Sequence, residues 1–250
     1  MPSEHIVSSF DQDLDALRRL VVEMGGHAES QLNLAVQAVS RRDAALAERV
    51  RNNDGRLDEY EHEIDAAAVR LLALRSPVAA DLRETVSTLK ISVDLERIGD
   101  YAANVAKRVS AIVQAPPMRP VHGIPLMGRL VREAISDVMY AYAERDVEKA
   151  LQVWKRDEEV DDLYNGIFRE TLTYMMEDAR NITASTHLLF MAKNIERIGD
   201  HATNIAETVF FIAEGRMLSD DRPKSDVTSF ALVNSDTDET ENQSDGEEPG

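Results

Sequence analysis

The stretch Leu-Glu-Arg-Ile-Gly-Asp-Tyr-Ala-Ala-Asn-Val-Ala at residues 95–106 returns as Ile-Glu-Arg-Ile-Gly-Asp-His-Ala-Thr-Asn-Ile-Ala at residues 195–206. The copies are 100 residues apart, a period that indicates a duplicated domain rather than a short-period solenoid. Whatever Glu96 and Asp100 do, we therefore expect Glu196 and Asp200 to do again on a second, pseudo-symmetric surface.

The rest of the chain follows the same duplicated plan. Apolar residues recur at helical spacing over 14–39, 50–74 and 82–113, and again over 126–144, 147–177 and 182–214. Ser76-Pro77 is typical of a helix start, and the prolines between Pro116 and Pro125 end the third helix. The sequence predicts an all-α protein of six long helices in two pseudo-symmetric three-helix bundles, 1–117 and 118–219.

Composition limits the function classes. The chain has 250 residues, no cysteine and a net charge of −18, so disulfide chemistry is excluded and nucleic acid is not an expected partner. No apolar run is long enough to insert into a membrane and no signal peptide begins the chain, so we expect a cytoplasmic protein. Residues 220–250 are acidic and poor in large apolar groups, which predicts a disordered tail.

The duplicated carboxylates indicate metal binding. Glu96 and Asp100 are four residues apart on one helix face, where they repel each other by a few tenths of a kcal/mol, roughly, unless a cation lies between them. The second helix of each copy adds another pair at the same spacing and should lie beside the third helix. The predicted metal ligands are Glu96, Asp100, Glu196, Asp200, Asp54, Asp58, Asp157 and Asp161.

Residues beside these pairs receive more ordinary interpretations. Asn104 and Asn204 lie one turn further along and could support a metal site, whereas Glu61-x-x-x-Asp65 has no repeated counterpart and should remain solvated. Arg97 and Arg197 should form salt bridges to a neighbouring helix. A close approach of helices should explain Gly99 and Gly199, and His201, whose counterpart is Tyr101, should be an ordinary surface or core histidine.

The duplicated Glu-Arg-Ile-Gly-Asp motif, each copy followed by Ala-x-Asn-(Val/Ile)-Ala, resembles the PhoU family over most of residues 8–216. The resemblance implies two similar bundles carrying iron or zinc clusters, with manganese or magnesium as alternatives. It implies a cytoplasmic negative regulator of the phosphate-starvation response, with a phosphate ABC transporter ATPase subunit and a sensor histidine kinase as partners. We also expect a homodimer. Asp94 is replaced by Asn194 in the second copy, so the two metal sites need not be equivalent.

Two other functions remain open from the sequence. One is a di-metal bundle enzyme of the oxidase or ferritin type, which would need a Glu-x-x-His motif on each of two helices. Glu59-x-x-His62 is the candidate for one such motif, but the counterpart of His62 is Asn165. The other is a metal-free helical adaptor with solvated carboxylates. We expect no enzymatic activity.

Overall fold

The computed structural model describes residues 2–75, 77 and 79–218, and every regular element in that range is helical. The long helices are α1 (Pro2–Arg41), α3 (Gly55–Arg75), α4 (Ala79–Lys107), α6 (Gly123–Glu144), α8 (Asp157–Glu177) and α9 (Ile182–Glu214). The short elements are α2 (Ala44–Asn52), α5 (Val109–Gln114), α7 (Val147–Lys155) and the 3₁₀ turns η1 (Arg119–His122) and η2 (Ala179–Asn181). The predicted all-α fold with six long helices is confirmed, while the predicted cap Ser76 and tail 220–250 lie outside the described residues.

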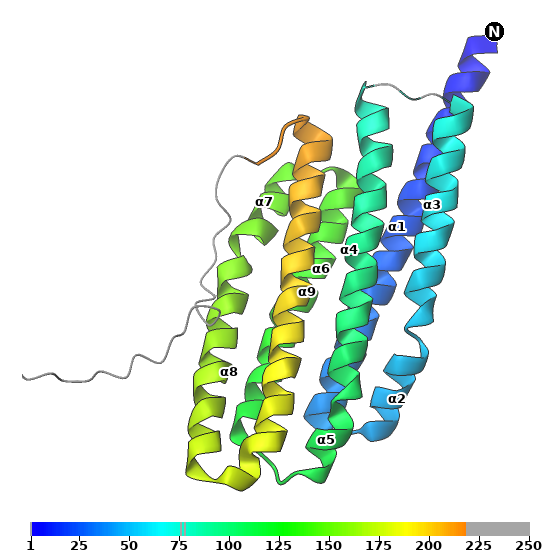
Figure 1. Ribbon diagram of the computed structural model, residues 1–250. Helices are drawn as coiled ribbons and strands as arrows, with labels where there is room; N and C mark the ends of the chain where they lie inside the picture. The colour runs from blue at the N-terminus through cyan, green and yellow to red at the C-terminus, as the bar shows by residue number, and fades with distance from the viewer. Residues whose placement is uncertain (1, 76, 78, 219–250) are drawn as a thin grey trace, which may run out of the picture.

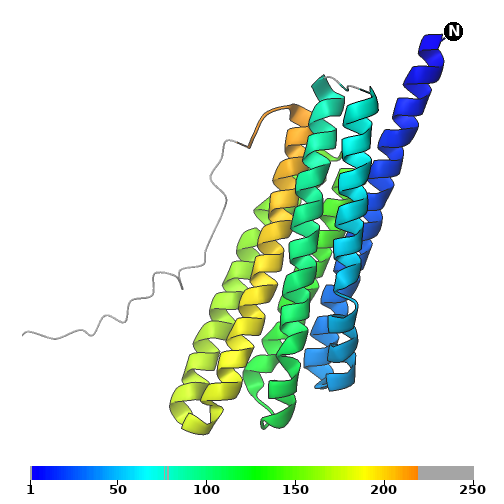
Figure 2. The same ribbon diagram turned by 45° about the vertical axis from the view of Figure 1, so that its right-hand side comes forward.

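The two copies share one hydrophobic core. In the first copy α3 and α4 pack against α1, and in the second α8 and α9 pack against α6. The copies meet through extensive α4–α9 and α1–α6 contacts. Figures 1 and 2 show α8, α9, α4 and α3 side by side in one layer, with α6 and α1 behind them. The seams α3–α4 and α8–α9 therefore both lie in the same layer.

Helices α4 and α9 each carry buried apolar side chains at helical spacing. On α4, Ile91, Leu95 and Ile98 are fully buried, and Ile195 and Ile198 on α9 are equally inaccessible. The three- and four-residue steps between them give each helix one apolar stripe, which must face a partner to leave water. None of the described helices is long and apolar enough to cross a membrane.

The corner after the first helix of each copy is built twice in the same way. Arg42 and Arg145 both adopt a left-handed backbone conformation with φ of 54°. The next residue caps the following helix, because Asp43 accepts a hydrogen bond from the Leu46 amide at 2.9 Å. Asp146 does the same for the Lys149 amide at 3.0 Å. Each cap satisfies an amide that the first turn of the helix leaves without a partner.

The second helix of each copy is broken, and the prediction of continuous helices over 50–74 and 147–177 is wrong at these points. The first break follows α2 at Asn53 and Asp54, within the run Asn52-Asn53-Asp54-Gly55 of turn-forming residues. The second is at Arg156, which has no such run around it. As a result Asp54 directly precedes α3, and Asp157 is the first residue of α8. The partial positive charge of a helix N-terminus favours carboxylates there. The third helix also breaks, at Arg108 between α4 and α5.

Candidate metal centre

The first carboxylate cluster lies at the seam between α3 and α4. Burial raises the pKa of Asp54, and the negative charges of Asp100 and Asp58 raise it further. The three carboxylates thus lie in one region of the protein, although Asp54 precedes α3, Asp58 lies in α3 and Asp100 lies in α4. The charges of Asp54 and Asp58 therefore interact with those on α4, and their role as metal ligands stays a prediction.

Glu96 shows that this first cluster has a fifth member. Burial raises the pKa of Glu96 to about 7, with a further contribution from Asp100, and Arg97 opposes the shift. The negative charges of Glu61 and Asp58 raise this pKa as well, so Glu61 adds a fifth carboxylate to the charge around Glu96. Its side chain is only partly exposed, so Glu61 is less solvated than an isolated surface pair would be. The repeat could not show this, because its counterpart is Tyr164.

The second cluster lies at the seam between α8 and α9, where Glu196 is only 5% exposed. Burial raises its pKa to about 7, and Asp200 and Asp161 act in the same direction, whereas Lys193 opposes them. The ammonium of Lys193 lies 3.0 Å from Glu196 Oε1. Among the described residues, the other oxygen, Oε2, is buried without any hydrogen-bond partner. An ionised carboxylate in this position lacks full compensation for the water it has lost.

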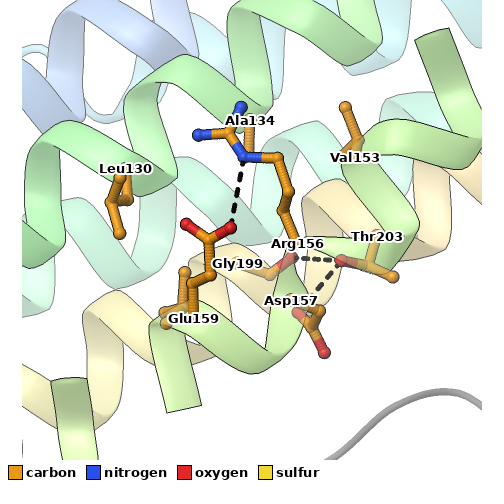
Figure 3. Close-up of a pocket in the computed structure, with 9 residues that line it drawn as sticks. Leu130, Ala134, Val153, Arg156, Asp157, Glu159, Gly199 and Thr203 are labelled. Atoms are coloured by element: carbon orange, nitrogen blue, oxygen red, sulfur yellow. Dashed lines mark hydrogen bonds and ion pairs between the residues drawn. The ribbon is translucent and has the colours of Figure 1, made fainter. Parts of the chain in front are cut away.

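Asp157 is held in place by α9. The Thr203 hydroxyl donates to Asp157 Oδ1 at 3.0 Å, and Asp157 is 5% exposed. Figure 3 shows this contact in a small pocket at the break between α7 and α8, with Gly199 of α9 in its wall. The counterpart of Thr203 in the first copy is Ala103, which has no hydroxyl to offer Asp54. The two clusters therefore differ in how their carboxylates are supported.

Between the clusters, a polar contact joins the two copies. His201 Nδ1 of α9 lies 2.7 Å from Asp94 Oδ1 of α4, and the Asn204 amide donates to the same oxygen at 3.4 Å. Asn204 is thus directed to the other copy, not to the metal ligands of its own, while Asn104 is exposed. The expectation of an ordinary histidine missed this pairing, which unites residues 107 positions apart.

The motif arginines behave differently from each other. Arg97 lies 3.4 Å from Glu96 and 3.2 Å from Asp100, so its salt bridges are on its own helix and not on a neighbouring one as predicted. Its side chain is 52% exposed, which makes such pairs weak. Arg197 instead lies over the ring of Tyr101 in the first copy, 5.7 Å from its centroid.

The motif glycines allow close packing to different degrees. A Cβ atom on Gly99 would overlap Leu57 of α3, which confirms the predicted close approach of helices at this position. A Cβ atom on Gly199 would meet Val160 at 3.5 Å, an ordinary van der Waals separation. Only the first copy therefore requires glycine for space.

Comparison with known proteins agrees with the duplication. The model of the PhoU domain matches the chain twice, over residues 21–109 and 124–209. The chain belongs to the PhoU family. A phosphate-specific transport system accessory protein PhoU homolog of Caulobacter vibrioides is 52% identical over 228 residues, covering 91% of this chain and 99% of that relative. The accessory protein PhoU of Escherichia coli K12 is 36% identical over 214 residues, covering 86% and 89%.

Solved PhoU structures share the fold. The crystal structure of PhoU from Pseudomonas aeruginosa is 38% identical and has a TM-score of 0.80, with 83% of this chain and 100% of that chain covered. PhoU from Streptococcus pneumoniae, described as a phosphate transport system regulatory protein, is 27% identical with a TM-score of 0.76. The arrangement of six long helices is therefore that of the PhoU family.

The carboxylate clusters contain the donor atoms that a metal cation needs, but their side chains are not arranged as a coordination shell. All eight predicted ligands supply oxygen, the donor that magnesium, manganese and iron accept and that zinc tolerates. The buried oxygen of Glu196 without a partner favours a positive ligand at the second seam. Yet no three Asp, Glu or His side chains among residues 10–74 and 79–218 are arranged to hold one ion together. A bound metal would have to draw the side chains closer.

Proposed function

We propose that this PhoU-family protein is a negative regulator of the phosphate-starvation response. The observation that carries the proposal is the match to accessory proteins of phosphate-specific transport over nearly their whole length, at up to 52% identity among those compared. The relatives' names connect them with phosphate transport, and a regulator rather than a catalyst fits a chain without a paired Glu-x-x-His motif. When phosphate is plentiful, the protein keeps the response switched off and restrains uptake.

Its partners in this proposal are the ATPase subunit of the phosphate ABC transporter and a sensor histidine kinase. The protein works in the cytoplasm as a homodimer and relays the state of the transporter to the kinase. A net charge of −18 favours basic surfaces on those partners and disfavours nucleic acid.

Divalent metal completes the proposal. Asp54, Asp58, Glu96 and Asp100 would bind it at the α3–α4 seam, and Asp157, Asp161, Glu196 and Asp200 at the α8–α9 seam. The metal would supply positive charge that neutralises the carboxylates and cross-links the two helices of each seam. Iron or zinc clusters are expected, with manganese or magnesium as alternatives, and no turnover accompanies binding. The near-neutral pKa of Glu196 supports this role, since a cation would stabilise the charged form that burial disfavours.

The regulatory proposal is tested by deleting the gene in its own organism. Starvation-induced genes should then be expressed even in phosphate-rich medium, and removing the kinase as well should silence them again. Normal repression in the deletion strain would refute the regulatory role. Induction that persists without the kinase would refute the proposed link to it.

The metal proposal is tested on the purified full chain. Asp100→Ala should lower bound metal at one seam and leave the other largely occupied, and the double variant with Asp200→Ala should lose both. Glu170→Ala, which removes an exposed carboxylate of α8, is the control and should retain full metal content. Unchanged metal content in the double variant would show that other residues bind it. Oxygen consumption with ferrous iron would favour the oxidase reading instead.

A further inference from the structure

We propose that the ammonium of Lys193 competes with metal for Glu196 at the α8–α9 seam. The α8–α9 site then has the lower metal affinity, and the α3–α4 site fills first. This inference rests on the metal binding proposed above. It concerns how the chain itself sets the affinity of each site.

Lys193 is fixed among the second set of ligands from two sides. Its ammonium lies 3.0 Å from Glu196 Oε1, and the side chains are 29% and 6% exposed. The same ammonium lies over the ring of Tyr164, 4.9 Å from its centroid. A cation held both by a carboxylate and by an aromatic face is more firmly placed than an exposed surface lysine. A divalent ion that uses Glu196 must displace this ammonium or share the carboxylate with it.

The first copy is more negative at the same two positions, because it lacks the lysine and gains a carboxylate. The counterpart of Lys193 is Val93, which is 45% exposed. The counterpart of Tyr164 is Glu61, whose negative charge acts on Glu96. Among the described residues, the α3–α4 seam therefore has a fifth carboxylate, Glu61, and an uncharged side chain, Val93, where the other seam has Tyr164 and Lys193.

The other cation near the first site competes less. Arg97 lies 3.4 Å from Glu96 and 3.2 Å from Asp100, but its side chain is 52% exposed, against 29% for Lys193. Water can replace such an arginine at little cost when a metal arrives. At the second seam a further carboxylate also has a partner, because the Thr203 hydroxyl donates to Asp157, whereas Ala103 gives Asp54 nothing.

The test is a titration of the metal-free, full-length protein with Mn²⁺, measured by calorimetry and by the EPR signal of unbound Mn²⁺. The wild-type protein should show two classes of site whose affinities differ by about tenfold or more, a gap of about 1.4 kcal/mol. In an Asp100→Ala background, which leaves the second site, Lys193→Met should raise Mn²⁺ affinity by about tenfold. Methionine retains most of the apolar stem of lysine and removes the ammonium that lies over Tyr164. Lys107→Met removes the same charge from an exposed position of α4 and should change nothing.

The reciprocal substitution keeps the proposal testable even if Lys193→Met fails to fold. In an Asp200→Ala background, Val93→Lys places an ammonium beside the first site and should lower its affinity. Val93 is exposed, so the longer side chain fits without repacking. Equal affinities in the wild type, or first-site binding unmoved by Val93→Lys, would overturn the role of Lys193 while leaving metal binding intact. If the wild-type protein binds no Mn²⁺, iron or zinc, the metal part of the proposed function fails along with it.

Discussion

Glu196→Gln should stabilise the metal-free protein at alkaline pH and have little effect in acid. The pKa of Glu196 is raised from 4.5 to about 7, mainly by burial. Because the folded protein holds this proton more tightly than the unfolded chain does, protonated Glu196 favours folding. This contribution is complete below pH 4.5 and is lost as the pH rises through about 7, the pKa in the folded state. The wild-type free energy of unfolding should therefore fall between about pH 4.5 and pH 7.

The size of the effect follows from the shift. Each pKa unit corresponds to about 1.4 kcal/mol, so the ionised Glu196 costs up to about 3 kcal/mol relative to its protonated form. Glutamine has nearly the same shape and no charge, and its oxygen can still accept from Lys193. We expect Glu196→Gln to raise the free energy of unfolding by about 2 kcal/mol at pH 8 and by less than about 1 kcal/mol at pH 5.

The measurement is urea unfolding with a chelator present, followed by circular dichroism at both pH values. Glu170→Gln, at an exposed position of the same seam's α8, is the control and should leave the pH dependence unchanged. With saturating Mn²⁺ the order should reverse, because the wild-type carboxylate then has a cation to bind. A wild-type stability that does not fall over this range, or a variant that falls in parallel with it, would refute the reasoning.

The remaining predictions concern stability, measured by urea unfolding without metal. Asp43→Ala and Asp146→Ala should each cost about 1 kcal/mol, because each removes a helix N-cap; equal stability to the wild type would mean that water replaces the cap. Glu84→Ala should cost about 3 kcal/mol, because the buried carboxylate pairs with arginines from both copies, and a loss below about 1 kcal/mol would contradict this. Gly199→Ala should stabilise α9 by up to about 1 kcal/mol, whereas Gly99→Ala should gain less or lose stability through its overlap with Leu57; the reverse order would refute the packing account.

Repetition in the sequence made the fold predictable and singled out the eight carboxylates that stay candidate ligands. Helical periodicity gave the six long helices, and carboxylates recurring at a fixed spacing placed each pair on one face. The break at Arg156 was not predictable, because nothing in Lys155-Arg156-Asp157 resists a helix by itself. It depends on the packing of the elements on either side.

Residues that differ between the copies could not be interpreted from the repeat. Glu61 and Lys193 have counterparts of different charge, so the duplication offers no reason to assign them to a site. Their roles depend on distances between helices, which spacing along one helix does not contain. The pairing of Asp94 with His201 likewise requires knowing that α4 and α9 lie against each other.

The shared core has an evolutionary consequence. Two separate identical chains meeting along α4 and α9 would change both sides of their contact with every mutation, and would associate only at sufficient concentration. Joining them in one gene product makes the association intramolecular and lets each half vary alone. The result is visible where Asp94 meets His201, since the symmetry-related positions carry Asn194 and Tyr101. One polypeptide can thus keep two sites of common ancestry while giving each its own affinity.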